Sequence, residues 1–329
     1  MTGWRLDRAW PAPQIVQPQW DDGTASAATE QEVAIAFDYQ ILYDSPALTV
    51  ADIQWHAHEA RPTSEFQSPR AEITFQRRGL FHKRCGGREV ACDPNTLLFI
   101  EAEQPYRLTH PIPGPCACTA LLVPRDVLAG SGLPQQPPAG DAPARLFDFE
   151  DCPSTLGFTR TQEVLLALAR RRDPADGLRI EELGLTLVRA AVTRGLRFQR
   201  GRFRGNRAAT ERAHRDWVQA VKSLLTQRFG ARMSLMDLAK AVHCAPAHLC
   251  WVFRQQTGMS IHRYRTNLRL RAALAELADG QTNLARLAAE LGFSSHSHFA
   301  TVFRREMGFS PSQMARRERA EWAARFVEI

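Results

Sequence analysis

Two histidines stand two positions apart in the sequence, at His56 and His58. On a β-strand this spacing places both imidazoles on one face, as the ligands of a metal ion require. Glu65 or Glu72, together with His110, could complete a metal site. No clear second metal motif follows, however, and we predict no metal and no other cofactor. Two other interpretations explain these residues better. Either the histidines are ordinary loop residues, or the set His56, His58, Glu72 and His110 forms hydrogen bonds with an organic ligand.

Cys116 and Cys118 form a second alternating pair. Two thiols on one strand face could sense redox state or bind a soft metal ion. We favour the simpler interpretation that both pack inside a strand. The 7 cysteines are irregularly spaced and include no CxxC pair, which argues against a disulfide framework and structural zinc. The sequence also lacks the P-loop, GxSxG, HExxH and GxGxxG motifs, so we predict that the protein is not an enzyme.

Charge is distributed unevenly along the 329 residues. Residues 201–329 contain 21 Lys and Arg against 10 Asp and Glu, a net charge of +11, whereas residues 1–200 carry −4. A basic third beside an acidic body favours a polyanionic partner such as nucleic acid. The N-terminus lacks the apolar core of a signal peptide, and no run reaches the about 18 apolar residues of a membrane span. We therefore expect a cytoplasmic protein without a membrane partner.

The C-terminal third contains an internal repeat. The first copy includes Leu238, Ala239, Leu249, Phe253, Arg254, Gly258 and Ser260. The second includes Leu287, Ala288, Phe299, Phe303, Arg304, Gly308 and Ser310. From Leu249 and Phe299 onward, the spacings of the two copies are identical. Each copy has the pattern of a short helix, a tight turn and a second helix, which indicates a helix-turn-helix unit. A generic helical bundle would require neither the duplication nor the basic charge.

Local signals predict where the helices begin and end. Apolar spacing predicts helices over 161–172, 180–198, 214–229, 235–242, 246–256, 261–278, 283–290 and 296–306. The predicted N-caps are Ser234, Ser260, Thr282 and Ser294 or Ser295, and the predicted stops are Gly230, Gly258, Gly280 and Gly308. The helix that joins the copies would be roughly 30 Å long, and successive major-groove faces of B-DNA lie about 34 Å apart. One chain could therefore read two successive grooves without dimerising.

Exposed positions on the second helix of each unit are the ones that would face DNA. These are Ala247, His248, Cys250, Trp251 and Arg254 in the first unit, and His296, Ser297, Ala300, Thr301, Arg304 and Arg305 in the second. The three arginines are predicted to contact phosphates, which would make binding fall steeply with salt; solvated surface is the alternative. For Trp251 the alternative is a buried core anchor. We interpret Cys250 and Cys244 as small packing residues rather than sensors.

Residues 214–316 resemble the DNA-binding domain of the AraC/XylS transcriptional regulators. The stretch from Ala288 to Ser312 resembles the signature segment of that family nearly residue for residue. The family usually has arginine where this chain has Trp251, and often where it has Thr301. Arginine reads guanine through two parallel hydrogen bonds, whereas tryptophan and threonine suit thymine methyls. The resemblance therefore implies fewer arginine–guanine contacts and more readout of apolar groups and DNA shape.

Short β-like runs at 34–37, 48–50, 73–75, 88–91 and 97–100, separated by turn residues, indicate a sandwich or barrel. This region resembles the cupin-like sensor domain of many AraC/XylS members, which implies a small-molecule effector. We predict an α+β multidomain protein with a flexible arm (1–30), a cupin-like β-barrel (31–150), a helical dimerisation segment (151–200), a basic linker (201–213) and an all-α double helix-turn-helix domain (214–320). The resemblance further implies promoter DNA, RNA polymerase and a second copy of the chain as partners. A metal-dependent cupin enzyme, or a redox or metal sensor, fused to a DNA-binding domain is the alternative.

Overall fold

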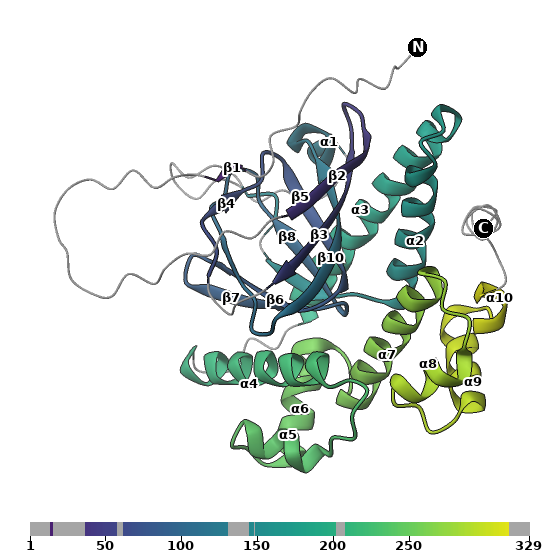
Figure 1. Cartoon of the computed structure of the whole chain (residues 1–329). Coiled ribbons are helices and arrows are strands. Elements are labelled where there is room, and N and C mark those ends of the chain that lie inside the picture. Colours follow the sequence, from purple (N-terminus) through teal and green to yellow (C-terminus); the bar gives the residue numbers. More distant parts are fainter. Residues whose placement is uncertain are drawn as a thin grey trace.

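The computed structural model describes residues 14–15, 37–57, 62–130, 145–147, 149–201 and 208–315. Figure 1 shows a β-domain, two long helices beside it and a helical C-terminal part. This arrangement confirms the predicted α+β class, with β-structure in the N-terminal half and an all-α C-terminal part. Several predicted features lie outside the described residues, namely most of the arm over 1–30, the strand residues 34–36, His58 and residues 202–207.

Three antiparallel sheets form the β-domain. The main sheet has six strands in the order β11-β8-β5-β10-β3-β2. Their bounds are β2 Phe37–Asp44, β3 Thr49–Ala57, β5 Ala71–Arg78, β8 Thr96–Ile100, β10 Gly114–Val123 and β11 Asp151–Pro153. A three-stranded sheet combines β7 Arg88–Cys92, β6 Phe81–Cys85 and β9 Arg107–Thr109. The third sheet pairs β1 Gln14–Ile15 with β4 Phe66–Gln67.

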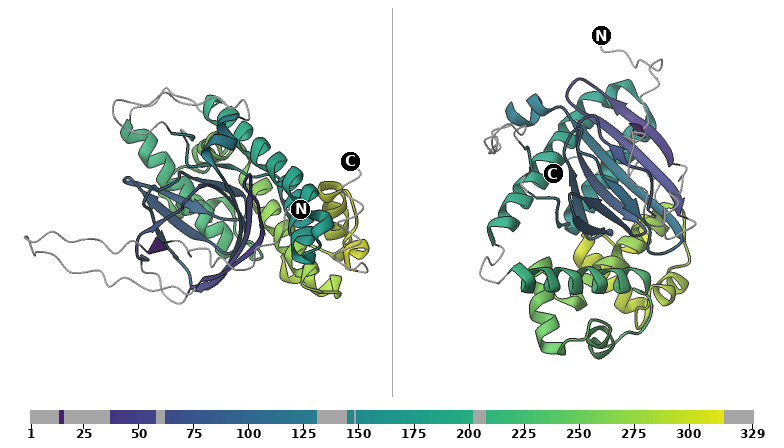
Figure 2. Two further views of the ribbon diagram at one scale, coloured as in Figure 1. Left: turned by 90° about the horizontal axis from the view of Figure 1, so that it is seen from above. Right: turned by 90° about the vertical axis from the view of Figure 1, so that its left-hand side faces the viewer.

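Both faces of the main sheet are buried, because successive side chains of a strand point to opposite faces. In β5, Glu72 and Thr74 line the interior that the main sheet shares with the three-stranded sheet. Ile73 and Phe75 belong to the apolar core on the other face. Two helices cover that other face, α2 Leu156–Arg171 and α3 Gly177–Gly201, joined through the short η1 Pro174–Asp176 (Figure 2). The predicted helical segment thus begins with strand β11, and the helices follow it.

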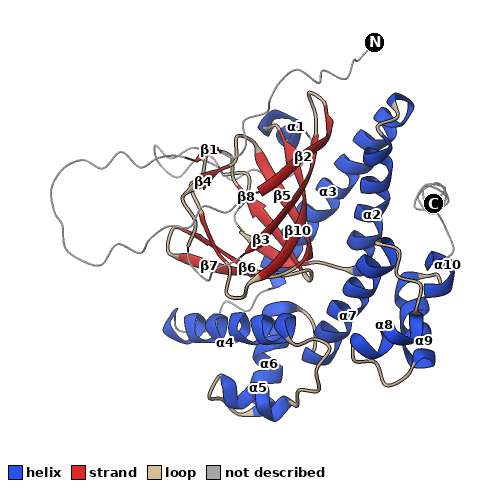
Figure 3. Ribbon diagram, in the orientation of Figure 1, coloured by secondary structure: helices blue, strands red, loops and turns tan. Residues whose placement is uncertain are grey.

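The described residues of the C-terminal part, 208–315, form seven helices, coloured blue with the other helices in Figure 3. They are α4 Ala208–Gln227, α5 Leu235–Ala241, α6 Pro246–Thr257, α7 Ile261–Ala278, α8 Leu284–Glu290, α9 His296–Met307 and α10 Pro311–Ala315. A further short helix, α1 Arg125–Gly130, follows β10. The pairs α5–α6 and α8–α9 are the two predicted helix-turn-helix units, with α7 between them (Figure 1).

The helix ends agree with most of the predicted caps. Ser234 forms a capping box with Asp237, and Ser260 and Ser295 accept hydrogen bonds from the first turns of α7 and α9. Gly258 and Gly308 end α6 and α9 in the left-handed conformation, with φ of 67° and 83°, which glycine adopts without strain.

Two local predictions were wrong. Asn283, not Thr282, caps α8, because its side chain accepts the hydrogen bond from the Arg286 amide. The predicted linker over 201–213 is also too long, since α3 includes Gly201 and α4 already begins at Ala208. Residues 208–213 are therefore helical, and His214 lies inside α4 rather than at its start.

Candidate nucleic-acid interface and sensor cavity

The first recognition helix, α6, has one buried and one exposed face. Leu249, Val252 and Phe253 are at most 1% exposed and pack against α4, α5 and α7. All five predicted DNA-contacting positions of this unit are exposed, namely Ala247, His248, Cys250, Trp251 and Arg254. The structure thus places them together along one outer surface.

An aromatic cluster lies on this outer surface. The rings of His248 and Trp251 are stacked, with centroids 5.9 Å apart and an interplanar angle of 16°. His214 and Trp217 of α4 complete the cluster, each within 6 Å of the His248 ring. Trp251 is 45% exposed, so the alternative of a buried core anchor is wrong. Its indole is held by neighbours yet open to a ligand, which favours contact with base edges or sugars. Sequence reasoning missed His214 and Trp217, which lie in another helix.

The second recognition helix, α9, has a polar outer face. Phe299 and Phe303 are fully buried on its inner face. His296, Ser297, Thr301, Arg304 and Arg305 are exposed on the outside, and Ala300 is half-buried. Arg305 pairs with the neighbouring Glu306 at 2.8 Å, which reduces its positive field. Arg304 is thus better placed than Arg305 to meet a phosphate.

The helices that flank the first unit, α4 and α7, contact the β-domain through buried hydrogen bonds at the turn between β7 and β8. Asp93 is fully buried, and its Oδ2 accepts hydrogen bonds from Tyr264 Oη at 2.6 Å and from Thr226 Oγ1 at 3.0 Å. Asn95 donates to the Tyr264 carbonyl at 2.9 Å and accepts from Arg271 Nε at 3.1 Å. We call these five residues the interdomain latch. Arg271 also donates to Thr159 of α2.

Further polar contacts surround the latch. Lys222 Nζ of α4 donates to the Ala91 carbonyl at 2.7 Å, and the Ala91 amide donates to Gln219 Oε1 at 2.9 Å. Both Lys222 and Arg271 are 4% exposed. Such burial of charged side chains requires hydrogen-bond partners, so these contacts fix α4 and α7 against the β-domain in one arrangement. No short motif in the sequence indicates this interface.

The second unit is attached differently, because it contacts α2, α3 and the main sheet through apolar packing. Leu287, Phe299 and Phe303 belong to one continuous core with residues of α2, α3 and the main sheet. The first unit instead has a core of its own, built from α4, α5, α6 and the first half of α7. The two units are therefore alike internally but differ in how they are attached.

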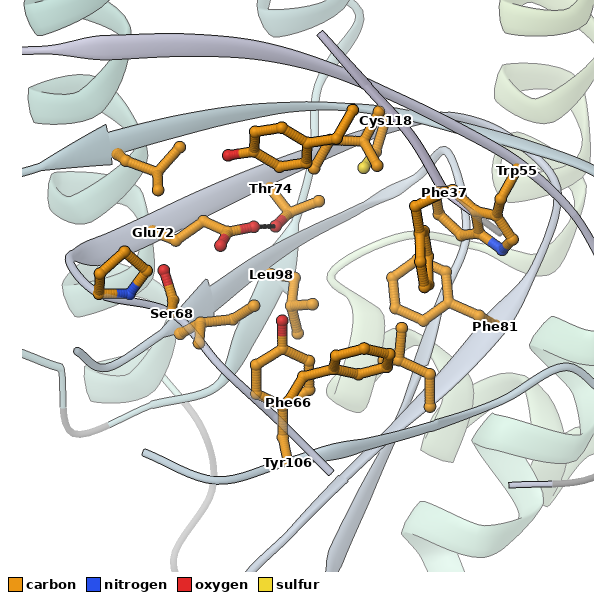
Figure 4. A pocket seen from close by; sticks show the side chains of 16 residues that line it. Phe37, Trp55, Phe66, Ser68, Glu72, Thr74, Phe81, Leu98, Tyr106 and Cys118 are labelled. Atoms are coloured by element: carbon orange, nitrogen blue, oxygen red, sulfur yellow. Dashed lines mark hydrogen bonds between the residues drawn. The ribbon is translucent and has the colours of Figure 1, made fainter. Parts of the chain in front are cut away.

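A cavity of about 60 Å³ lies inside the β-domain. Figure 4 shows Glu72 with Thr74 and Ser68 on one side of it, and Phe37, Trp55 and Phe81 on the other. The remaining lining residues are Tyr39, Ile53, Phe66, Pro69, Leu98, Ile100, Tyr106, Leu108, Cys118 and Leu122. Thr74 Oγ1 donates to Glu72 Oε1 at 2.8 Å. The cavity thus combines a mostly aromatic wall with one acidic group, which suits a small organic ligand.

The histidines predicted to bind a ligand lie apart from Glu72. His56 is exposed, because Trp55 and Ala57 beside it in β3 face inward. His110 is buried and accepts a hydrogen bond from Trp55 Nε1 at 2.6 Å, so it lies behind the cavity wall. Burial lowers the pKa of His110 to about 4. Of the predicted set within the described residues, only Glu72 lines the cavity.

The described residues of the β-domain provide neither a cluster of metal ligands nor a readily ionised pair of thiols. Within the described residues, which exclude His58, no group of three or more His, Cys, Asp or Glu side chains could hold a metal. Cys116 and Cys118 are buried, which confirms the interpretation as packed strand residues. Burial raises the pKa of Cys116 to about 11 and that of Cys118 well above its usual value, so the reactive thiolate is disfavoured. Cys244 is half-buried, whereas Cys250 is exposed and does not pack in a core.

A β-domain with an internal cavity, joined to paired helix-turn-helix units, defines the class of two-domain DNA-binding regulators. Residues 42–149 match the AraC-binding-like domain model, and residues 238–317 match a helix-turn-helix domain model. The chain belongs to the AraC/XylS family. Within the described residues, no helix combines the length and apolar character needed to cross a membrane.

Two curated proteins are similar in sequence to part of this chain. The transcriptional activator RhaR of Yersinia pestis is 28% identical over 168 residues, which are 50% of this chain and 55% of RhaR. The Msm operon regulatory protein of Streptococcus mutans is 27% identical over 97 residues, or 30% of this chain and 35% of that protein. The aligned part of the chain thus spans about half the length of RhaR and about a third of the Msm protein.

The solved structures to which this chain is similar include two bacterial proteins. ToxT from Vibrio cholerae is 10% identical, with 82% of this chain and 98% of ToxT covered and a TM-score of 0.32. The C-terminal domain of AraT, a response regulator from Geobacillus stearothermophilus, is 24% identical, with 30% of this chain and 84% of that domain covered and a TM-score of 0.29.

Proposed function

We propose that this protein regulates transcription by placing α6 and α9 in two successive major grooves of promoter DNA, under the control of a small effector. The duplicated unit carries the proposal, because each copy leaves the outer face of its second helix exposed. The 18 residues of α7 span about 27 Å, which approaches the about 34 Å between successive grooves. A single chain can therefore present both helices to one side of the duplex.

The exposed residues of the two helices would have different roles. Trp251 would contact thymine methyls or sugars, and Thr301 would contact a methyl or donate its hydroxyl. Arg254, Arg304 and, more weakly, Arg305 would position the helices on phosphates. Ala247, His248, Cys250, His296, Ser297 and Ala300 would complete the contact surface. Trp251 and Thr301 stand where AraC/XylS members usually or often have arginine, so guanine readout would be reduced.

The interdomain latch provides a physical route from effector to DNA. Phe81 of β6 and Leu98 of β8 line the cavity, and the turn that carries Asp93 and Asn95 lies between β7 and β8. A ligand that moves these strands would move the turn, and with it the partners of Tyr264 on α7. Because α7 connects both units, a small shift of the latch would change their spacing on DNA.

The division of the chain follows from the same architecture. We propose residues 31–150 as the sensor, 151–200 as a helical segment that pairs two copies, and a DNA-binding part that begins with α4. Leu178 of α3 is 79% exposed, as expected of an apolar residue that a second copy would cover. RNA polymerase would be contacted by the promoter-bound dimer, and DNA binding requires a cytoplasmic location.

Fluorescence anisotropy with DNA from upstream of the protein's own coding region tests the proposal. We expect specific binding that weakens steeply as salt rises, because arginine contacts release counterions. Footprinting should show protection of two adjacent major-groove segments on one face of the duplex. A chain that binds this DNA no better than a scrambled duplex, or that binds equally at low and high salt, would contradict the proposal.

A further inference from the structure

We propose that the ligand of the cavity is a small apolar monocation, such as a primary aromatic amine, whose ammonium group pairs with Glu72. This inference deepens the proposed function, since it names the effector class of the sensor. The juxtaposition that supports it is a buried carboxyl group at one end of a cavity with aromatic rings at the other (Figure 4).

The carboxyl group of Glu72 lacks a cationic partner inside the cavity. Glu72 is only 8% exposed, and within the described residues that line the cavity there is no lysine, arginine or histidine. The nearby Lys83 is fully buried, but it pairs with Glu150 at 3.4 Å and does not line the cavity. A buried carboxylate is costly unless it is hydrogen-bonded and paired with a positive charge. A cationic ligand would supply that charge.

Burial raises the pKa of Glu72, and hydrogen bonds from Thr74 and Ser68 and the charge of Lys83 offset this rise only in part. An ammonium group within hydrogen-bond distance would lower this pKa, because opposite charges stabilise one another. The ligand's own charge would thus favour the ionised form of Glu72, and that ionised form would repel an anionic ligand.

The opposite wall suits the apolar body of such a ligand. Phe37 and Trp55 have ring centroids 5.4 Å apart, and Phe81 lies 5.7 Å from Trp55. These aromatic side chains offer a large apolar surface against which a ring of the ligand can pack. A cavity of about 60 Å³ is small, since about 15 Å³ holds one water molecule, so the ligand should be no larger than about one ring.

Three nearly isosteric compounds test the charge preference, namely benzylamine, benzyl alcohol and benzoate. Their binding to the full chain is measured by calorimetry and by thermal shift in the absence of DNA. We expect benzylamine to bind at least tenfold more tightly than benzyl alcohol, and benzoate to bind most weakly. Equal or tighter binding of the alcohol or of benzoate, or no binding of the amine, would overturn the proposal.

A pair of variants localises the effect. Glu72→Gln should lower benzylamine affinity at least tenfold and leave benzyl alcohol nearly unchanged. The control Glu65→Gln removes a carboxylate that faces Arg107 outside the cavity, and it should change neither affinity. If Glu72→Gln does not fold, Thr74→Val takes its place, because it removes the hydrogen bond that favours ionised Glu72 and should weaken the amine more than the alcohol. Equal losses for both ligands would contradict the assigned charge role. Since no DNA is present, a negative result would leave operator binding as a separate question.

Discussion

The two helix-turn-helix units share a sequence pattern but differ in their attachment to the rest of the chain. The first unit has its own apolar core, and its flanking helices α4 and α7 meet the β-domain through buried hydrogen bonds around Asp93. The second has its inner residues in one core with α2 and α3. Hydrogen bonds are directional and contribute only modest net free energy each, whereas apolar packing is not directional and grows with buried area. The first unit is therefore the better candidate for a part that an effector releases.

Their outer faces differ as well. The first unit presents a stack of His248 and Trp251, and the second presents serine, threonine and histidine. A duplicated motif has thus diverged on the surface that would face DNA while its buried positions stayed apolar. The two units would be expected to read unlike half-sites.

Replacing a core phenylalanine by alanine, in one unit at a time, should give the largest effects on stability. The hydrogen-exchange patterns of the two variants should also differ most clearly. Both Phe253 and Phe303 are fully buried, so either change to alanine should lower stability by about 3–5 kcal/mol. In hydrogen exchange, Phe253→Ala should deprotect α4, α5 and α6 and leave α2 protected. Phe303→Ala should deprotect α2 together with α8 and α9, because their cores are continuous. Identical exchange patterns in the two variants would show that the difference in attachment has no energetic meaning.

Opening the latch should have the next largest effect. Asp93→Ala leaves the buried hydroxyl of Tyr264 without its acceptor, at a cost of about 2 kcal/mol, while the hydroxyl of Thr226 keeps the Lys222 carbonyl. Exchange should rise in α4 and at the start of α7 and stay constant in α9. Tyr264→Phe, which removes a single hydrogen bond, should produce a smaller change of the same kind.

Asp126→Ala is the matched control for the latch, because Asp126 is exposed on α1 and lies outside the interface. It should leave both exchange and stability unchanged. The latch variants should also change operator affinity or its response to effector. If Asp93→Ala binds DNA with wild-type affinity and wild-type effector response, the latch does not couple the two parts.

Much of the DNA-binding part was predictable from sequence because its signals are local. Apolar spacing and serine or glycine caps lie within a few residues of the helix ends that they determine, as at Ser234 and Gly258. The error at Thr282 arose because Thr282 and its neighbour Asn283 are both good caps. The latch was not predictable, since Asp93 and Tyr264 are 171 positions apart and meet only through tertiary packing.

The sensor site was predicted only in part, for a related reason. The pair His56 and His58 drew attention by its spacing, but the neighbours Ile53, Trp55 and Ala57 are apolar at the alternate positions of the same strand. That alternation indicates that His56 faces outward, and it could have been used. Glu72 lines the cavity, and its contact with a ligand stays a prediction, whereas the aromatic wall combines residues from several strands that no short motif connects.

Substitution of residues that differ between the outer faces of α6 and α9 should have moderate effects on DNA binding. Trp251→Ala should weaken operator binding by about 1–3 kcal/mol and relax base preference in one half-site only, because the indole contact is lost. Thr301→Ala should cost less and act on the other half-site. Trp251→Arg should shift the preference of the first half-site toward guanine. Anisotropy with libraries that vary one half-site at a time measures each change.

Asp126→Ala is again the control, since Asp126 is exposed on α1, away from both recognition helices and outside the segment proposed to pair two copies. It should leave the affinity of a single chain for DNA unchanged. Loss of preference in both half-sites from Trp251→Ala alone would mean that the units do not read DNA independently.

The smallest expected difference is the contribution of His214, on α4 beside the first unit, to the dependence of stability on pH. Burial, and secondarily the charge of His248, lowers the pKa of His214, so the folded chain favours the neutral imidazole. Below the ordinary histidine pKa of about 6.5, the unfolded chain therefore binds more protons at this position, and stability falls as the pH drops. Melting temperatures should decline less on acidification in His214→Gln than in the parent chain. His82 also has a pKa lowered by burial and contacts Ser223 of α4, so the comparison is repeated with His82→Gln as background. If His214→Gln leaves the acid sensitivity unchanged in that background, the aromatic cluster does not contribute to the pH response of the first unit.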